Sequence, residues 1–277
     1  MAHRTAAVFG MEEVGGRTLK VARWNWGRVG QAPPLLFFNG IGTNCETVAP
    51  LAEALSERPF ITFDMPGIGG SPDPVTPYNP VTIACLAEGL IERFGLAEVD
   101  VMGVSWGGGI AQQMTLQHPA RVRRLVLAAT NAGVVMVPGP ATATVALFDP
   151  RRMTDPDFLA DGFKAVYGAI VGRDQAHLAR FKAPSAIGYA YQLLAMAGWT
   201  SAPFLPLLRP PTLVLSGDAD DIVPLANAHL LHSLIPGSKL EIVRGGGHMF
   251  LLSHGPETVQ LLRNFLDAAD TGERVAA

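Results

Sequence analysis

The sequence predicts an α/β fold with a mostly parallel central sheet, because short apolar runs alternate with helix-like segments along 277 residues. The apolar runs are rich in Val, Ile, Leu and Phe, which is typical of strands that are buried on both faces. We expect six such strands, at Leu35–Asn39, Phe60–Asp64, Val99–Val104, Arg124–Ala129, Thr212–Ser216 and Lys239–Val243. Helical spacing predicts the flanking helices at Val48–Ser56, Thr82–Phe94, Trp106–His118, Asn227–Leu234 and Pro256–Ala268.

One long interval interrupts this alternation, since about eighty residues between Ala129 and Thr212 contain no convincing buried strand. A structureless loop of that length is improbable in a compact domain, so we expect a helical insertion. Its amphipathic pieces are Asp157–Val171, Asp174–Phe181 and Ser185–Ala197. We therefore divide the chain into a core, residues 1–133 and 208–277, and a helical cap, residues 134–207. The cap either adds cover to the core or closes a pocket at the carboxyl ends of the strands, where open α/β sheets bind ligands.

Composition excludes several classes of protein. With 48% hydrophobic and 16% charged residues and a net charge of −3, the chain is neither disordered nor suited to nucleic acid. Two cysteines without metal-type spacing, Cys45 and Cys85, are expected as free buried thiols in a reducing compartment. No apolar signal-peptide core follows Met1, and no run reaches the roughly 20 apolar residues of a membrane span. We expect a cytoplasmic protein.

The most informative motif is Gly103-Val104-Ser105-Trp106-Gly107, which lies between a predicted strand and a predicted helix. A serine at such a sharp turn adopts a strained backbone conformation, and its small neighbours let the strand and the helix approach each other. The turn exposes the hydroxyl and directs a helix N-terminus at it, which favours developing negative charge. The motif predicts that Ser105 is a nucleophile.

A nucleophilic serine requires a base, and among the seven histidines we select His248. It follows a predicted strand through Gly245-Gly246-Gly247, a turn flexible enough to carry an imidazole over the sheet edge. Five of the others are expected on solvated or packing surfaces: His3, His118, His177, His229 and His232. His254 is near in sequence but lies beyond the apolar stretch Met249–Leu252.

The base in turn requires an orienting carboxylate, expected between the serine and the histidine in chain order. Three acids, Asp218, Asp220 and Asp221, follow the predicted strand Thr212–Ser216. Like charges at this density are unfavourable unless one of them has a specific partner. We assign that role to Asp220, with Asp221 as the alternative; Asp218 is expected to cap the turn.

An oxyanion hole requires two backbone N–H groups. Trp106, the residue after the nucleophile, supplies one, and Ile41 in the loop Asn39-Gly40-Ile41-Gly42 is expected to supply the other. The glycine-rich stretches complete no dinucleotide or phosphate-loop motif, and the sequence contains no zinc-type motif. We therefore expect no cofactor and no metal.

Seven stretches also resemble the intracellular depolymerases of medium-chain-length polyhydroxyalkanoates, within the α/β-hydrolase fold superfamily: Phe37–Asn44, Phe63–Ser71, Gly103–Met114, Leu125–Gly139, Gly198–Ser201, Thr212–Asn227 and Gly247–Leu251. The Trp after the nucleophile, the Asn-Gly-Ile-Gly loop and the Val-Met-Val-Pro-Gly run are the more particular features of this subgroup. Residues 140–197 match poorly, and the acid turn reads Asp-Ala-Asp-Asp where the family tends to have three consecutive acids.

The resemblance implies an α/β-hydrolase fold and a serine ester hydrolase that cuts a polyester of 3-hydroxy acids. An apolar acyl pocket is then expected from Met136, Trp199, Met249, Phe250 and the Trp106 side chain. The low charge content is compatible with docking on a hydrophobic polymer granule. Two alternatives stay open: a carboxylesterase or lactonase for small acyl esters, and a non-catalytic protein that binds a ligand or a granule. A carbon–carbon hydrolase would use the same three side chains.

Overall fold

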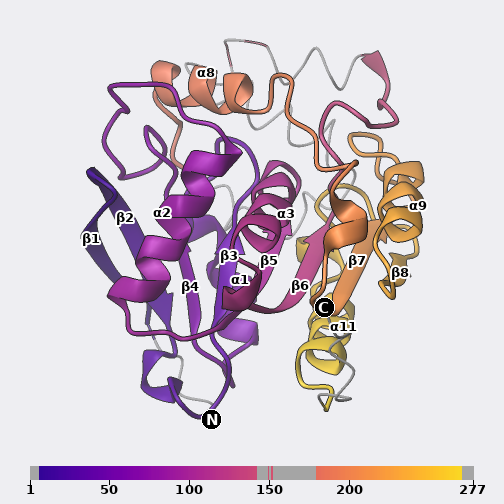
Figure 1. Ribbon diagram of the computed structural model, residues 1–277, viewed down its shortest axis with the longest axis horizontal. Helices are drawn as coiled ribbons and strands as arrows, with labels where there is room; N and C mark the ends of the chain where they lie inside the picture. The colour runs from indigo at the N-terminus through magenta and orange to yellow at the C-terminus, as the bar shows by residue number, and fades with distance from the viewer. Residues whose placement is uncertain (1–5, 142–148, 150, 152–178, 270–277) are drawn as a thin grey trace.

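The computed structural model describes residues 6–141, 149, 151 and 179–269 and contains one eight-stranded sheet (Figure 1). Its spatial order is β1-β2-β4-β3-β5-β6-β7-β8. The six predicted strands are present, which confirms the α/β class; they are β3 (Leu35–Phe38), β4 (Phe60–Phe63), β5 (Val99–Val104), β6 (Val122–Ala128), β7 (Thr212–Gly217) and β8 (Lys239–Val243). These six strands run parallel to one another, so their carboxyl ends meet at one edge of the sheet.

Two further strands, β1 (Val8–Val14) and β2 (Arg17–Trp24), form an N-terminal hairpin that the sequence analysis did not predict. The hairpin joins the sheet through antiparallel pairing of β2 with β4. Strand β1 lies at the sheet edge, and most of its residues are exposed or half-buried. Because edge strands face solvent and carry charged residues, they lack the continuous apolar run that identified the inner strands.

Helices cover both faces of the sheet and enclose two apolar layers. One layer lies under α2 (Pro80–Arg93), α3 (Trp106–Gln117) and α9 (Leu225–Leu234), and the other under α1 (Ala49–Ala54), α10 (Phe250–Ser253) and α11 (Gly255–Leu266). Successive β3 residues alternate between the layers: Leu36 and Phe38 belong to the first, Leu35 and Phe37 to the second. Short 3-10 turns occur at η1 (Trp26–Arg28), η2 (Cys45–Val48), η3 (Pro119–Arg121) and η5 (Leu205–Leu207).

Two expectations about burial are wrong. Strand β8 is largely exposed. It forms the second edge of the sheet, so it pairs with a neighbouring strand, β7, on one side only. Cys85 is exposed although Cys45 is buried, because Cys85 lies on the outward face of α2, opposite the buried Ile83, Leu86 and Leu90. Both thiols are free. Within the described ranges, no helix has the length and apolar character to cross a bilayer.

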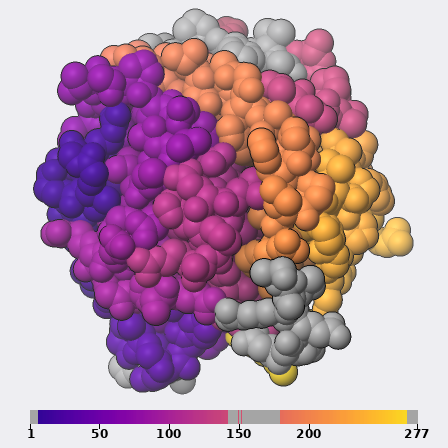
Figure 2. All heavy atoms as spheres, viewed as in Figure 1, coloured from indigo at the N-terminus to yellow at the C-terminus, as the bar shows by residue number. Residues whose placement is uncertain are grey.

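The described part of the predicted cap crosses the upper edge of the sheet (Figure 1). Helix α8 (Ala186–Ala195) lies there, and the segment that contains it packs over the top of the face shown in Figure 2. Its Gly188 approaches Gly67 so closely that a Cβ on Gly67 would lie 2.5 Å from the Gly188 Cα. The predicted helix Asp157–Val171 and most of Asp174–Phe181 lie outside the described residues.

Candidate active site

Ser105 lies at the turn between β5 and α3 with φ 55° and ψ −123°, a conformation that non-glycine residues rarely adopt. The turn is held from both sides, because the Ser105 N–H donates to the Ala128 carbonyl (2.9 Å) and the Ser105 carbonyl accepts from Thr130 Oγ1 (2.7 Å). These bonds from β6 and the residues after it over-determine the strained backbone. The turn predicted from the sequence is therefore formed as expected.

Glycines permit the close approach of strand and helix at this turn. A Cβ on Gly103 would lie 2.2 Å from the Gly107 carbonyl oxygen, and a Cβ on Gly107 would lie 2.2 Å from the Phe38 carbonyl oxygen. Both contacts are with backbone, which cannot move aside as a flexible side chain would. The positions flanking Ser105 therefore require glycine for steric reasons.

His248 and Asp220 form a buried pair, with 2.8 Å between His248 Nδ1 and Asp220 Oδ2. The loops after β7 and β8 bring the two residues together across 28 positions of sequence. The second carboxylate oxygen, Asp220 Oδ1, accepts the N–H groups of Ile222 and Val223, both at 2.9 Å. Three hydrogen bonds therefore hold this carboxylate in one orientation.

The contacts of Asp220 determine the tautomer of the imidazole. A carboxylate only accepts hydrogen bonds, so His248 Nδ1 carries a proton and donates it to Asp220 Oδ2. In the neutral ring, the lone pair then resides on Nε2. His248 and Ser105 line the same cavity. This arrangement gives the imidazole the tautomer that a general base requires.

The other acids of the turn have different surroundings. Asp218 is exposed and its Oδ1 accepts the Gly245 N–H at 2.6 Å, so it links the two loops as the expected turn cap. Asp221 is exposed, so the buried position beside the imidazole belongs to Asp220.

Of the remaining histidines, His232 contacts Ser238 and His254 contacts Ser253, and neither lines the cavity. His118 and His229 do not line the cavity either, and His3 and His177 lie outside the described residues. In the part of the chain that the structure describes, no three His, Cys, Asp or Glu side chains are grouped as a metal site would need.

The loop after β3 lies beside Ser105, since a Cβ on Gly40 would lie 3.7 Å from the Ser105 Cβ. The Gly40 carbonyl accepts the Thr43 hydroxyl at 2.6 Å. In a trans peptide the C=O and the following N–H point in opposite directions, so this bond turns the Ile41 N–H away from Thr43. Trp106 opens α3, where the first N–H groups have no partner within the helix. Both expected oxyanion donors thus border the nucleophile.

A largely apolar cavity of about 590 Å³ surrounds these groups. Its walls come from the β3 loop, from η2 and α1, from the residues after β6, from α8 and from the residues after β7 and β8. Among the expected pocket residues, four side chains line it: Trp106, Met136, Trp199 and Met249. Phe250 does not. It is fully buried in the second apolar layer, because it is the first residue of α10 and faces the sheet.

Several cavity residues were not predicted from the sequence. Leu51 and Leu252 add an apolar wall, and Asn39 and Gln192 add amide groups. Asn39 Nδ2 and Gln192 Nε2 are buried and have no hydrogen-bond partner among the described residues. Asn39 was detectable as the polar residue that ends a buried strand. Gln192 was not, because only tertiary structure brings α8 to the cavity.

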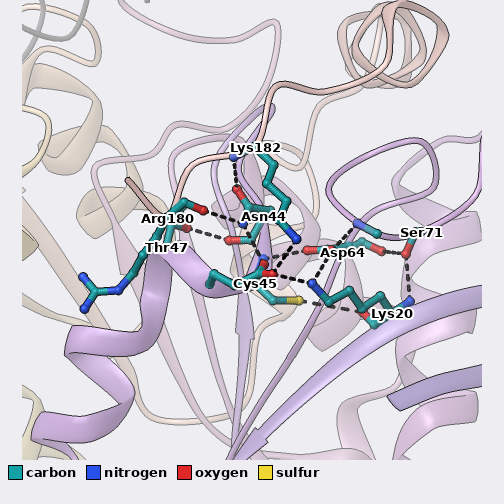
Figure 3. A network of polar contacts seen from close by, with 10 residues as sticks. Lys20, Asn44, Cys45, Thr47, Asp64, Ser71, Arg180 and Lys182 are labelled. Atoms are coloured by element: carbon teal, nitrogen blue, oxygen red, sulfur yellow. Dashed lines mark hydrogen bonds and ion pairs between the residues drawn. The ribbon is translucent and has the colours of Figure 1, made fainter. Parts of the chain in front are cut away.

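A polar network connects the start of η2 to the core and to the segment that precedes α8 (Figure 3). Glu46 accepts hydrogen bonds from Lys20, Asn44 and Lys182, and Asn44 also bonds to the backbone of Arg180 and Lys182. Burial acts to raise the pKa of Glu46, but these hydrogen bonds outweigh it and lower that pKa to about 2. The carboxylate form of Glu46 therefore stabilises this corner of the fold.

The family model described as alpha/beta hydrolase fold matches residues 33–255. A poly(3-hydroxyalkanoate) depolymerase of Ectopseudomonas oleovorans is 40% identical over 238 residues, which cover 84% of each chain. A 2-hydroxymuconate semialdehyde hydrolase of Pseudomonas putida is 30% identical over 284 residues, which cover 93% of this chain and 96% of the relative.

Solved structures share the same fold. The enol-lactonase of Burkholderia xenovorans LB400 superimposes with a TM-score of 0.81 at 24% identity, covering 94% of this chain and all of that one. An esterase of Exiguobacterium antarcticum superimposes with a TM-score of 0.79 at 22% identity, with 94% and 100% of the chains covered. At these identities the likeness concerns the fold alone.

Proposed function

The chain belongs to the alpha/beta hydrolase fold family, and on that premise we propose that it is a serine hydrolase that cleaves carboxylic esters through an acyl-enzyme. The observation that carries the proposal is the Asp220–His248 pair, whose histidine lines one cavity together with Ser105, a half-buried serine in a strained turn. A buried pair of this kind orients an imidazole for proton transfer. The 40% identical depolymerase and a 28% identical pimeloyl-[acyl-carrier protein] methyl ester esterase of Aromatoleum aromaticum support ester chemistry.

The reaction proceeds in two steps. Ser105 Oγ attacks the ester carbonyl carbon while its proton passes to His248 Nε2, and the N–H groups of Ile41 and Trp106 hold the oxyanion. Collapse of this intermediate breaks the bond to the alcohol oxygen, which takes the proton from His248. Water then repeats the sequence on the acyl-enzyme, releasing the acid and restoring Ser105. Asp220 stabilises the imidazolium in both steps.

We assign a polyester of 3-hydroxy acids as the substrate. The assignment is supported by the depolymerase relative and by a cavity with apolar walls on several sides of Ser105. A polyester segment presents an acyl part and an alcohol part to the scissile bond, and both require apolar room. Trp106, Met136, Trp199 and Met249 are proposed to contact it, and residues 134–207 to form the cap.

The test is a substrate panel measured on the wild type and on Ser105→Ala. We expect release of hydroxy acids from medium-chain polyhydroxyalkanoate, with at least a 10³-fold loss of kcat in Ser105→Ala. Hydrolysis of soluble esters without any attack on polymer would instead indicate a carboxylesterase or lactonase. If Ser105→Ala retains wild-type turnover, the serine mechanism is wrong.

The relative named 2-hydroxymuconate semialdehyde hydrolase favours a second candidate, a carbon–carbon bond hydrolase with the same three residues. Adding 2-hydroxymuconate semialdehyde to the panel separates this activity from ester hydrolysis. Binding of polymer or ester without turnover, in a protein with an intact Ser105, would indicate a non-catalytic binding protein.

We further propose that the enzyme acts in the cytoplasm on a hydrophobic polymer granule. Both thiols are free, and exposed apolar residues surround the cavity mouth, where Val134 and Met136 are exposed and also line the cavity. Val135→Ser, which replaces a 46% exposed residue there, is expected to weaken sedimentation with polymer granules. Val75→Ser is the matched control, because Val75 is 94% exposed but lies away from the cavity wall. Equal sedimentation of the two variants contradicts docking at this mouth.

A further inference from the structure

Gln192 of α8 is hydrogen-bonded to both segments that we assign to the oxyanion hole. Its Oε1 accepts the Gly42 N–H at 2.7 Å, and its backbone carbonyl accepts Trp106 Nε1 at 3.0 Å. The residue is fully buried, with 0% of its surface exposed. Tyr189, one turn earlier on the same helix, packs against the same loop, since a Cβ on Gly42 would lie 3.0 Å from Tyr189 Cε2. Helix α8 therefore contacts the loop through one continuous face.

These contacts fix the backbone around Ile41. The Thr43 hydroxyl holds the peptide that contains the Ile41 N–H, through the Gly40 carbonyl. Gln192 holds the next peptide, through the Gly42 N–H. Gly42 has φ 70°, and a glycine adopts either sign of φ readily, so sterics alone do not prevent this peptide from rotating. Without the Gln192 amide, the Ile41–Gly42 peptide would lose its anchor, and Ile41 would be held only from its N-terminal side, so its backbone and N–H could shift together.

A packing role alone does not account for an amide at this position. Gln192 Nε2 is buried and has no hydrogen-bond partner among the described residues, which is unfavourable. A Leu or Met side chain would fill the same space without an unpaired donor. The feature that only the amide provides is the acceptor for the Gly42 N–H.

We propose that Gln192 is a positioning residue for the oxyanion hole, through which the cap fixes the direction of the Ile41 N–H. It touches no reacting atom and acts through the Gly42 and Trp106 segments. The inference rests on the proposed ester hydrolysis by Ser105. On this inference, α8 must be in place both to enclose the substrate and to stabilise the transition state.

The test is Gln192→Met, which keeps the length of the side chain and removes the amide acceptor. We expect kcat to fall about 10- to 100-fold, which is no more than the effect of removing a whole oxyanion donor. We expect KM to change less than about threefold. Binding of a trifluoromethyl ketone, whose serine adduct places an oxyanion in the hole, should weaken by the same factor as kcat/KM. An analogue in which an ether oxygen replaces the ketone carbonyl group forms no adduct with the serine. Its binding should be the same in Gln192→Met and in the wild type.

Gln260→Leu on the exposed face of α11 is the control for loss of a glutamine amide remote from the cavity, and it should keep wild-type kinetics. Wild-type kcat and ketone affinity in a folded Gln192→Met contradict the positioning role and leave ester hydrolysis intact. Absence of ester hydrolysis in the wild type would instead overturn the proposed function.

Gln192→Glu is the second variant, for the case in which Gln192→Met does not fold. Its side chain has the same length as glutamine and keeps an oxygen that can accept the Gly42 N–H. Burial raises the pKa of such a carboxyl, and its ionisation places negative charge against the oxyanion loop. We expect kcat of this variant to fall with rising pH through one ionisation that the wild type lacks. A pH profile identical to the wild type would contradict the proposal.

Discussion

Asp220 and Asp221 are adjacent in sequence and differ in what their carboxylates contact. Asp220 is 5% exposed and bonds to His248 and to two backbone N–H groups, whereas Asp221 is exposed. Asp220→Asn offers an amide where the imidazole Nδ1 needs an acceptor, which favours the wrong tautomer. We expect kcat to fall by about 10³- to 10⁴-fold.

Asp221→Asn is the matched control for this change, since it makes the same substitution one residue away. Its kcat should stay within about twofold of the wild type. Steady-state kinetics on one soluble ester measure both variants. A larger loss in Asp221→Asn than in Asp220→Asn would reverse the assignment of the orienting carboxylate.

For single residues, a catalytic role could be predicted wherever the order of residues along the chain is enough to indicate the chemistry. Ser105, Asp220 and His248 each follow a strand of the parallel part of the sheet, so their convergence at one sheet edge could be expected from the order of elements along the chain. Thr130 and Gln192 could not be identified in this way, because their hydrogen bonds to Ser105 and Gly42 join segments that only tertiary structure brings together. Phe250 was misplaced because α10 turns it toward the core.

The element that contains the nucleophile is the turn between β5 and α3, and its geometry makes a steric prediction. Gly107→Ala would place a methyl group 2.2 Å from the Phe38 carbonyl oxygen and 2.4 Å from that of Asn39. Because backbone must shift to relieve these contacts, we expect a loss of about 3 kcal/mol or more in the free energy of unfolding. Urea denaturation measures it.

Gly27→Ala serves as the control for Gly107→Ala, because Gly27 is exposed and no atom lies within 4 Å of a Cβ built there. Its free energy of unfolding should change by less than about 0.5 kcal/mol. Equal stability of the two variants would show that strand and helix separate more easily than the structure implies.

The junction of β2, η2 and the segment that precedes α8 predicts a pH-dependent contribution to stability (Figure 3). The pKa of Glu46 is about 2 in the folded protein and 4.5 as its ordinary value. Because folding lowers this pKa, the stabilisation is complete at pH values above the pKa of Glu46 in the unfolded state. It is lost as the pH falls through the pKa of Glu46 in the folded state. Glu46→Gln should therefore cost about 2 kcal/mol at neutral pH, with allowance for partial solvent screening.

The difference between Glu46→Gln and the wild type should shrink as the pH falls from about 4.5 toward 2, because both proteins then carry a neutral group at this position. Denaturation at a series of pH values provides the measurement, with Glu241→Gln on the exposed strand β8 as the control. A difference that is constant over this range would mean that the charge of Glu46 does not stabilise the junction.

Helices and strands could be predicted more accurately where they are more deeply buried. The inner strands β3 to β7 combine apolar composition with two covered faces, so composition alone located them. The hairpin β1–β2 was missed because most of β1 faces solvent, and β8 was found but wrongly expected to be buried. Of the cap, only α8 can be compared with its prediction, and its bounds agree to within two residues at each end.

For the molecule as a whole, a buried cluster of ion pairs lies at the end of the sheet opposite to Ser105. Asp100, near the start of β5, is buried and accepts hydrogen bonds from Arg58 (2.9 Å) and Arg123 (2.7 Å). Burial raises the pKa of Asp100, while the two arginines act against that rise. Asp100→Ala leaves two guanidinium groups without this partner and should cost about 3–5 kcal/mol in unfolding free energy.

The kcat of the folded Asp100→Ala protein should match the wild type, because Ser105 lies at the other end of the same strand. Asp267→Ala removes the more exposed carboxylate that also contacts Arg58, and it should cost less than about 1 kcal/mol. Thermal unfolding and kinetics below the transition provide both quantities. A large drop in kcat of folded Asp100→Ala would mean that the two ends are coupled.

Covalent labelling with a serine-directed fluorophosphonate tests most directly whether Ser105 is a nucleophile activated by His248. Intact-mass and peptide analysis should find one phosphonate per chain, on Ser105, with no label in Ser105→Ala and labelling slowed at least about 100-fold in His248→Ala. Label on another residue, or unchanged labelling of Ser105 when His248 is absent, would contradict a Ser105 nucleophile activated by His248.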